Sequence, residues 1–333
     1  MAEVVAAITF GAVVVYACLG GADYGCGLWD LTAGDADRGG PMRGRIDASL
    51  GPVWEANHVW LIFILVYLWG GFPRAFAAIT TTLAVPFAIV GLGVVFRGGA
   101  FVFRKSSATL AGARLHGVVF AVSSLVTPFF LGTIAGAVAG GRVPLGGGDP
   151  LRSWTGPLSL AGGMLAVLTC SFLAATLLAA DAQRSGEVAL SAAFRRRALA
   201  VGVVTGTAAL LAAATIGASA PALAAGLRGR AAPLVVLSAI AGLSALVDLR
   251  AARLERARWA AFAAVGSIVA GWGVAQYPAI LVGSADISDV AAHPAVLDAL
   301  AVVAGVGGLV VVPSLAWLLR LTQRPPDAGD GAR

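Results

Sequence analysis

Residues 198–220 read ALAVGVVTGTAALLAAATIGASA, with no charged side chain among them. The hydrocarbon core of a membrane is about 30 Å thick, and roughly 20 residues of α-helix cross it. This stretch is therefore long and apolar enough to span a membrane. Eight more stretches of this kind lie along the chain, at 4–30, 50–70, 74–96, 114–139, 157–181, 231–249, 258–278 and 296–319. The sequence predicts an all-α integral membrane protein with about nine transmembrane helices.

The composition agrees with a membrane environment. Of the 333 residues, 59% are hydrophobic and 12% are charged, and the mean hydropathy is +0.88. A soluble protein of this size needs more polar groups on its surface. The connections are too short for a soluble domain. We expect one polytopic membrane domain over residues 1–324 and a disordered cytoplasmic tail, rich in Pro, Gly and Asp, at 325–333.

The basic residues alternate between the connections and predict an orientation. The first, third, fifth and seventh connections and the C-terminal tail together hold 18 of the 23 Lys and Arg residues, and the even connections hold five. Basic residues mark the cytoplasmic side of a membrane protein. We therefore expect a multi-pass membrane protein with its N-terminus outside and its C-terminus in the cytoplasm.

The net charge of +6 does not indicate nucleic-acid binding, because the basic residues separate apolar stretches and do not form one stripe. Three cysteines, at Cys18, Cys26 and Cys170, lie in or beside apolar stretches without paired spacing. We interpret them as small packing residues, with no disulfide framework and no metal site.

The strongest candidate site is residues 51–60, GPVWEANHVW. Glu55, His58 and Trp54 have helical spacing that lets them share one face, and Asn57 adds an amide. A carboxylate, an imidazole and an amide at the cytoplasmic end of the second helix can form the mouth of a proton path. The alternative is an interfacial helix cap, with the acid near the helix N-terminus and tryptophans such as Trp60 at the headgroups.

Two further ionisable residues have open interpretations. Asp23 lies near the cytoplasmic end of the first stretch, where it either meets Glu55 or reaches the interface. Arg97 directly follows the third stretch, and we interpret it as a positive-inside residue.

The remaining polar ends have structural interpretations. Asp181 and Asp248 end the fifth and seventh stretches, where Arg184 and Arg250 lie close enough to neutralise them. Gln276 and Tyr277 end the eighth stretch on the outer side, as a polar helix end with an aromatic anchor.

Haem ligation can be assessed from the possible axial ligands. Haem iron within a membrane needs His, Met, Cys or Tyr ligands at the right depth. The histidines are His58, His116 and His293, and no two of them are expected centrally on facing helices. We predict that this chain binds no haem alone and no metal.

Residues 51–61, GPVWEANHVWL, resemble the signature G-P-x-W-[DE]-x-N-x-V-W-L of cytochrome bd-type quinol oxidase subunit II. Other segments resemble patterns of that family in chain order, at 19–27 (LGGADYGCG), 96–98 (FRG), 271–278 (GWGVAQYP), 287–292 (ISDVAA) and 312–315 (VPSL). The resemblance covers nearly the whole chain.

The resemblance implies a fold of two four-helix bundles plus one peripheral helix. It implies a haem-free subunit that packs against subunit I, which carries haems b558, b595 and d and the quinol site. It also allows for a small single-helix accessory subunit and contacts with membrane lipid. Such a complex oxidises quinol, reduces dioxygen to water and builds a proton gradient. In this family the acid at the position of Glu55 lies on a hydrophilic channel that delivers protons from the cytoplasm.

The chain departs from the family pattern at three positions. Gly20 replaces the first Asp of the family's D-G-F-D segment, Ala22 replaces its Phe, and Glu55 replaces the commoner Asp. The role of the missing Asp is thereby absent or relocated.

Two other classes of function compete. A secondary transporter or channel is also polytopic, but it usually carries polar groups near the membrane midplane, whereas these lie near helix ends. A purely structural membrane subunit, with Glu55 as an interfacial cap, is the third interpretation.

Overall fold

The computed structural model describes residues 1–51, 54–107 and 109–322. The side chains of a few residues inside helices, Glu55 among them, lie outside the described part, as does the predicted tail at 325–333.

The described chain is almost entirely helical. It contains twelve α-helices: α1 Ala2–Leu31, α2 Ala36–Leu50, α3 Trp54–Gly71, α4 Pro73–Thr82, α5 Ala84–Ser106, α6 Leu110–Ala139, α7 Pro157–Arg184, α8 Val188–Ser219, α9 Pro221–Arg228, α10 Ala232–Arg250, α11 Leu254–Gln276 and α12 Pro294–Thr322. A small antiparallel hairpin, β1 Ala279–Leu281 and β2 Ala285–Asp286, and a 3₁₀ turn at Ile287–Val290 precede α12. The predicted all-α membrane fold is confirmed.

By length and apolar composition, eight helices of the described chain can cross a membrane, and the bent pair α3–α4 raises the number to nine. The predicted span at 74–96 has the wrong boundaries. Pro73 begins the short helix α4, which turns by 119° from α3, and the next span is α5. An apolar sequence does not reveal such a turn, so α4 was counted as part of the span.

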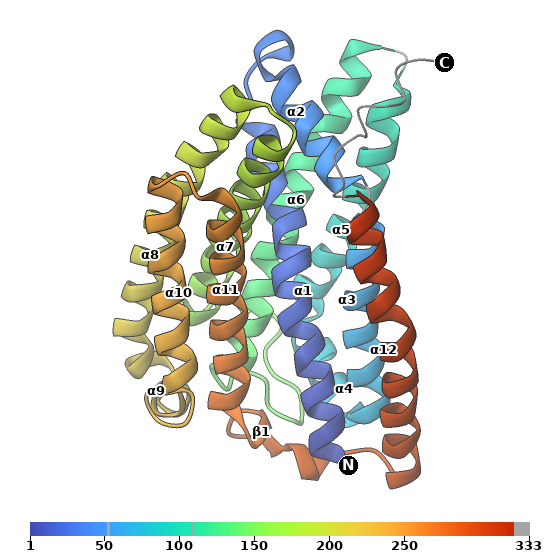
Figure 1. The fold of residues 1–333 in the computed structure, drawn as a ribbon. Helices are drawn as coiled ribbons and strands as arrows, with labels where there is room; N and C mark the ends of the chain where they lie inside the picture. The colour runs from blue at the N-terminus through green and yellow to red at the C-terminus, as the bar shows by residue number, and fades with distance from the viewer. Residues whose placement is uncertain (52–53, 108, 323–333) are drawn as a thin grey trace.

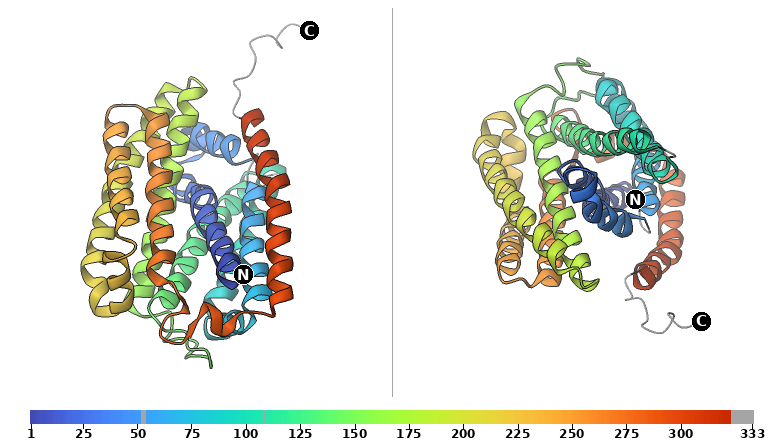
Figure 2. Two further views of the ribbon diagram at one scale, coloured as in Figure 1. Left: turned by 60° about the horizontal axis from the view of Figure 1, so that its bottom comes forward. Right: turned by 90° about the horizontal axis from the view of Figure 1, so that it is seen from above.

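Helix α1 lies at the centre of the molecule (Figures 1 and 2). It packs against α3, α6, α7 and α11, and α12 lies at the edge with few neighbours. Although it contains Gly20 and Gly21, α1 runs without a break. The division into two four-helix bundles stays a prediction.

Small residues bring the central helices together. A Cβ added at Gly25 of α1 would collide with the carbonyl group of Cys170 on α7, and one added at Gly132 of α6 would collide with the backbone of Gly162 on α7. Such close backbone approach is how helices associate in lipid, where no hydrophobic effect drives them together.

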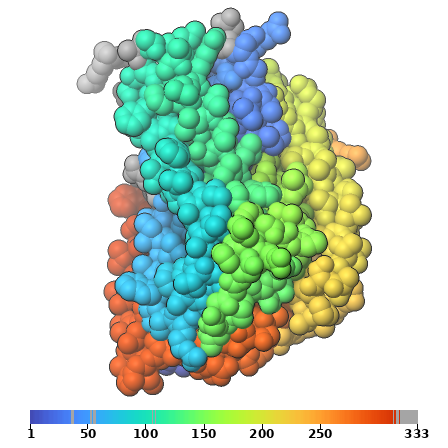
Figure 3. All heavy atoms as spheres, turned by 180° about the vertical axis from the view of Figure 1, so that it is seen from behind, coloured from blue at the N-terminus to red at the C-terminus, as the bar shows by residue number. Residues whose placement is uncertain are grey.

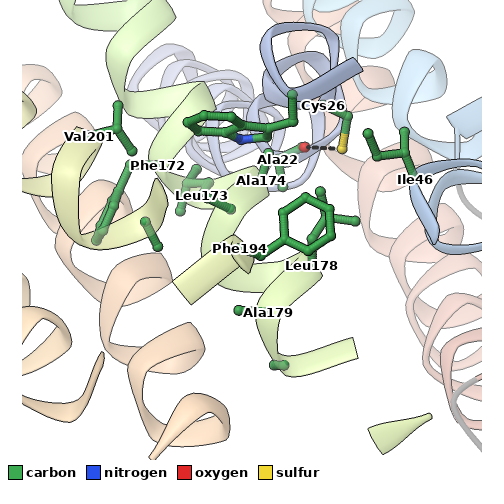
Figure 4. Close-up of a cluster of buried hydrophobic side chains, with 14 of the residues drawn as sticks. Ala22, Cys26, Ile46, Phe172, Leu173, Ala174, Leu178, Ala179, Phe194 and Val201 are labelled. Atoms are coloured by element: carbon green, nitrogen blue, oxygen red, sulfur yellow. Dashed lines mark hydrogen bonds between the residues drawn. The ribbon is translucent and has the colours of Figure 1, made fainter. Parts of the chain in front are cut away.

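One buried cluster joins α1, α2, α7 and α8 (Figure 4). It includes Cys26 and Ile46 as well as Phe172, Leu178 and Phe194. Helix α2 thus lies against one end of the bundle, at the top of Figure 1, which we call the α2 end. The three cysteines are free, and Cys26 and Cys170 are buried.

At the opposite end, where α1 begins, connections cover the bundle (Figure 3). The N–H of Gly148, between α6 and α7, donates to Oγ1 of Thr82 on α4 at 2.9 Å. The N–H of Leu145 donates to Oγ of Ser284 in the hairpin at 2.6 Å. This end is therefore closed by α4, the connection 140–156 and the hairpin.

Candidate functional site

A buried ion pair joins α1 to α5. Nη2 of Arg97 lies 2.5 Å from Oδ1 of Asp23, and the two side chains are 1% and 2% exposed. Nε of Arg97 donates to Oγ of Ser124 on α6 at 3.0 Å. The guanidinium also lies 4.8 Å from the ring of Tyr24 and 5.1 Å from that of Phe120. Three helices thus hold one cation.

The interpretation of Arg97 as a positive-inside residue beyond the third span was wrong. Because α4 takes up ten residues before α5 begins, Arg97 falls inside α5 and is buried. A charge in this position needs a partner, since an unpaired ion away from water is very costly. Asp23 provides that partner.

A second ion pair lies one step farther along the same two helices. Arg104 of α5 pairs with Asp30 of α1 and with Asp47 of α2, and Arg43 also reaches Asp30 at 3.2 Å. Arg104 lies 5.2 Å from the ring of Phe120. In each α1–α5 pair the arginine follows the aspartate by 74 residues, so the two pairs lie at successive levels along the same two helices. We call these two pairs the charge ladder.

His58 lies beside the charge ladder, at the start of α3. Its Nδ1 is 2.8 Å from the carbonyl oxygen of Trp54. A carbonyl only accepts, so Nδ1 carries the proton in the neutral ring and Nε2 keeps a free lone pair. Nε2 is buried and has no hydrogen-bond partner among the described residues. His58 therefore offers a proton acceptor inside the protein.

The surroundings of His58 are aromatic and polar. Its ring lies 6.3 Å from that of Tyr24 and 6.0 Å from that of Trp54. The Tyr16 hydroxyl donates to that of Tyr24 at 3.2 Å. Within the described structure, Oδ2 of Asp23 is a second buried atom without a hydrogen-bond partner. The site therefore holds two unused acceptors.

The start of α3 is fixed against α1. Nδ2 of the buried Asn57 donates to the carbonyl oxygen of Leu19 at 3.4 Å, and Trp54 packs on Phe101 of α5 with ring centroids 5.4 Å apart. The segments that carry Asp23 and Glu55 thus lie side by side. Contact between the two carboxylates stays a prediction, because the Glu55 side chain lies outside the described part.

Gly20 fits its surroundings closely. A Cβ at this position would lie 2.7 Å from the ring of Tyr16. Tyr16 thus fills the space that a longer residue at position 20 would need. The family Asp has no room here unless Tyr16 moves.

Trp60 and the residues at the end of α11 away from the α2 end make packing contacts and hydrogen bonds. The ring of Trp60 lies 6.4 Å from that of Phe63. Gln276 accepts from Nε1 of Trp272 at 2.8 Å and donates to the carbonyl of Ile280 at 3.0 Å. The bond to Ile280 ties α11 to the hairpin.

Tyr277 links the hairpin side of α11 to the start of α1. Its hydroxyl donates to Oε1 of Glu3 at 2.7 Å, and this hydrogen bond raises the pKa of Tyr277. A cavity of about 210 Å³ lies beside it, lined partly by Arg230, Gln276 and Pro278.

Carboxylates at the α2 end are paired with arginines. Asp181 pairs with Arg184, as predicted. Asp248 pairs with Arg253 at 3.9 Å and Arg256 at 3.6 Å, which lie beyond the predicted Arg250 because the chain turns back between α10 and α11.

The three histidines lie on different elements of the described structure. His58 opens α3, and His116 lies near the start of α6, with Nδ1 3.0 Å from Oγ of Ser107. Helices α3 and α6 are not neighbours along their lengths. His293 precedes α12 at the other end of the bundle. In the part of the chain that the structure describes, no three His, Cys, Asp or Glu residues form a metal-binding group.

The sequence reasoning missed several partners in this site. Ser124, Phe120 and the second rung of the charge ladder were not singled out. A signal existed, because Asp23 and Asp30 are seven residues apart, as are Arg97 and Arg104. Seven residues are about two helical turns, which places both members of each pair on one face.

These features define a polytopic helical membrane protein with buried ion pairs near its α2 end. The chain belongs to the family described as cytochrome bd terminal oxidase subunit II, which it matches over residues 1–322.

Comparisons with individual proteins agree. The structure of bd oxidase from Geobacillus thermodenitrificans is similar with a TM-score of 0.79 and 24% identity, over 96% of this chain and 98% of that chain. This likeness shows the fold.

Two curated relatives come from Bacillus subtilis (strain 168). "Cytochrome bd ubiquinol oxidase subunit 2" is 35% identical over 86 residues, which are 26% of this chain and 25% of the relative. "Putative cytochrome bd menaquinol oxidase subunit II" is 25% identical over 204 residues, 60% of this chain and 57% of the relative. The matched parts thus span a quarter and somewhat over half of the relatives' lengths.

Proposed function

We propose that this chain is the haem-free subunit II of a cytochrome bd-type quinol:oxygen oxidoreductase. It packs against a haem-bearing subunit I, which carries haems b558, b595 and d and the quinol site. The match to the family over residues 1–322 carries this proposal. No specific feature of the described residues favours a transporter or channel over it.

The chain contributes part of a proton path. Reduction of dioxygen to water consumes a proton for each electron that quinol supplies, and those protons must cross a low-dielectric region. Glu55, His58, Asn57 and Asp23 are the candidates at the start of α3 and the adjoining part of α1. The free lone pair on Nε2 of His58 supports this role, since an acceptor must be available before a proton can move.

Arg97 lies beside the proposed proton path and supports it electrostatically. An arginine stays charged in proteins, so Arg97 supplies a fixed positive charge beside the Asp23 carboxylate and the Tyr24 ring. Trp54 and Asn57 position the imidazole and the start of α3. Trp60, Gln276 and Tyr277 keep structural roles.

The complex belongs in the bacterial cytoplasmic membrane, with the α2 end of this chain facing the cytoplasm. In that orientation protons for water formation enter from the cytoplasm and quinol protons leave outside, which builds a proton gradient. Membrane lipid surrounds the complex, and a small single-helix accessory subunit is a further expected partner.

A reduced-minus-oxidised visible spectrum tests the haem assignment. The chain purified alone is expected to show no haem bands, and the chain co-expressed with its genomic neighbour is expected to show b- and d-type bands with quinol-dependent oxygen uptake. Haem bands in the chain alone would contradict the haem-free role. No bands in either preparation would contradict the oxidase assignment.

Glu55→Gln tests the proton path. The amide keeps the shape of the side chain and cannot carry a proton, so oxygen uptake is expected to fall while the haem bands of the assembled complex stay unchanged. Glu55→Asp is the matched control, because it keeps the carboxylate and should retain activity. If the Glu55→Gln complex assembles and its oxygen uptake is unchanged, Glu55 is an interfacial cap and not part of the proton path.

A further inference from the structure

Five arginines gather at the α2 end, where α8 meets the turn between α10 and α11. We call this group the arginine corner: Arg195, Arg196, Arg250, Arg253 and Arg256. Nη1 of Arg195 donates to the carbonyl oxygens of Leu249 at 3.4 Å and Arg250 at 3.3 Å. This contact joins α8 to the end of α10.

The arginine corner carries a local excess of positive charge. Asp248 is the carboxylate that pairs with it, at 3.9 Å from Arg253 and 3.6 Å from Arg256. Arg196 and Arg250 are exposed and make no ion pair with any described residue.

Other arginines at the same end are neutralised by carboxylates. Arg45 pairs with Glu187, and Arg184 pairs with Asp181. Arg258 pairs with Glu255 at 2.8 Å. Arg114 and Arg197 also make no ion pair with a described residue, but Arg114 lies on α6 and Arg197 donates to the carbonyl oxygen of Thr32 at 3.2 Å, so neither belongs to the arginine corner.

The turn that carries part of the corner is held in one conformation. Ala252 has a φ of 56°, a left-handed value that is unfavourable for a residue with a Cβ. Its N–H donates to the carbonyl of Leu249 at 3.2 Å, and the N–H of Arg253 donates to that of Asp248 at 2.8 Å. Arg250 and Arg253 are thus presented by a pinned turn.

Farther from the α2 end than the arginine corner, α8 and α10 both have exposed apolar faces. On α8, Arg196, Val203 and Leu210 follow one another at seven-residue spacing, and all three are exposed. Seven residues are about two turns, so they share one face.

Helix α10 repeats this arrangement. The exposed Leu243 and Val247 precede Arg250 by seven and three residues, which places all three on one face. Trp259 of α11 is 64% exposed near this level, as expected for an aromatic side chain among lipid headgroups.

We propose that the arginine corner binds the phosphate headgroup of an anionic phospholipid, whose acyl chains lie along the exposed faces of α8 and α10. The excess of guanidinium groups complements the phosphate, and the apolar faces below complement the chains. A free phosphate ion would use the same guanidinium groups but would gain nothing from those faces. The site does not depend on which end of the chain faces the cytoplasm.

Native mass spectrometry tests the site. The full-length chain, with the subunits that purify with it, is stripped of lipid in detergent and titrated with phosphatidylglycerol or with phosphatidylcholine of the same acyl chains. The unaltered protein is expected to prefer phosphatidylglycerol. Each basic residue near a membrane surface contributes about fivefold to such binding, so Arg196→Gln with Arg250→Gln should weaken phosphatidylglycerol binding roughly 30-fold.

Two variants keep the result interpretable. Arg152→Gln with Arg228→Gln removes the same charge from exposed positions at the opposite end and should leave the preference intact. Arg196→Lys with Arg250→Lys keeps the charge and should retain most of the preference, even if the Gln pair folds poorly.

Three outcomes would overturn the proposal. They are a protein without preference for phosphatidylglycerol, an equal loss in the opposite-end control, and displacement of the lipid by inorganic phosphate at matched concentration. The last result would identify a site for a soluble anion.

Discussion

At the scale of single residues, the Asp23–Arg97 pair limits which substitutions the centre of this protein can accept without losing stability. Both groups are nearly inaccessible, and the cost of burying them is offset by the contact between them, by the hydrogen bond to Ser124 and by the nearby rings of Tyr24 and Phe120. A pair of this kind adds little net stability, but loss of one member leaves a buried charge without compensation.

Arg97→Gln is therefore expected to destabilise the protein by about 3–5 kcal/mol, because Asp23 would remain buried and unpaired. The measurement is thermal unfolding in detergent, followed by tryptophan fluorescence. The double variant Asp23→Asn with Arg97→Gln should be more stable than Arg97→Gln alone, since both charges are then removed.

Arg38→Gln is the control for this prediction. Arg38 pairs with Asp35 at 4.0 Å, and both side chains are largely exposed, so its loss should change stability by less than about 1 kcal/mol. Equal unfolding temperatures for Arg97→Gln and Arg38→Gln would contradict the importance of the buried pair.

Residue types and spacing predicted part of this site. The polar segment at 54–58 and Asp23 were recognised because ionisable groups are rare in membrane spans. The pairing of Asp23 with Arg97 was not predicted, since it depends on where α5 begins. The tautomer of His58 also needs the carbonyl contact to Trp54, which no sequence pattern shows.

At the scale of helices, apolar runs predicted most of the spans and missed α2 and α4. Helix α2 contains Pro41 and several glycines, which lower helix propensity. The spacing of Met42, Ile46 and Leu50, four residues apart and all buried, was the available signal. Helix α4 is apolar enough to pass as part of a span, and only its turn from α3 distinguishes it.

Gly25→Ala tests the approach of α1 to α7. The new methyl group would collide with the backbone of Cys170, so the two helices must separate and their packing be lost. We expect a loss of several kcal/mol or failure to fold, comparable with severe overpacking of a core. The measurement is the yield of monodisperse protein and its unfolding temperature.

Gly11→Ala is the matched control on the same helix. A Cβ at Gly11 meets nothing within 4 Å, and alanine favours helix by about 1 kcal/mol over glycine. Unfolding temperature should be unchanged or slightly higher. A mild effect at Gly25 would show that the helices are less closely packed than described.

The connection 140–156 has a pH-dependent element. The Asp149 carboxylate accepts the N–H groups of Arg152 and Leu151, both at 2.8 Å, and these bonds lower its pKa. A lowered folded-state pKa means that the stabilisation is present above the unfolded value of about 3.9 and is lost as pH falls through the folded value.

Amide hydrogen exchange at Leu151 and Arg152 is therefore expected to accelerate below about pH 4, beyond the change in intrinsic exchange. Asp149→Asn keeps an acceptor that does not titrate, so it should remove the acid dependence. Persistence of the dependence in the Asn variant would assign it to another group.

At the scale of the whole molecule, the charge asymmetry predicts how the chain sits in the membrane. We expect Arg152→Cys to react with a membrane-impermeant maleimide in intact cells. Arg38→Cys, at the α2 end, should react only after the cells are permeabilised. The unaltered chain supplies the background from Cys18, Cys26 and Cys170. The reverse pattern would invert the assigned orientation.

The charge ladder also constrains how this chain can change length over evolutionary time. One residue inserted between Arg97 and Arg104 would rotate one rung by about 100° and move it about 1.5 Å, so both rungs could not close at once. The same holds between Asp23 and Asp30. Insertions in the connection 140–156 do not change the alignment of α1 with α5. We therefore expect natural length variation in that connection and not in the intervals 23–30 and 97–104.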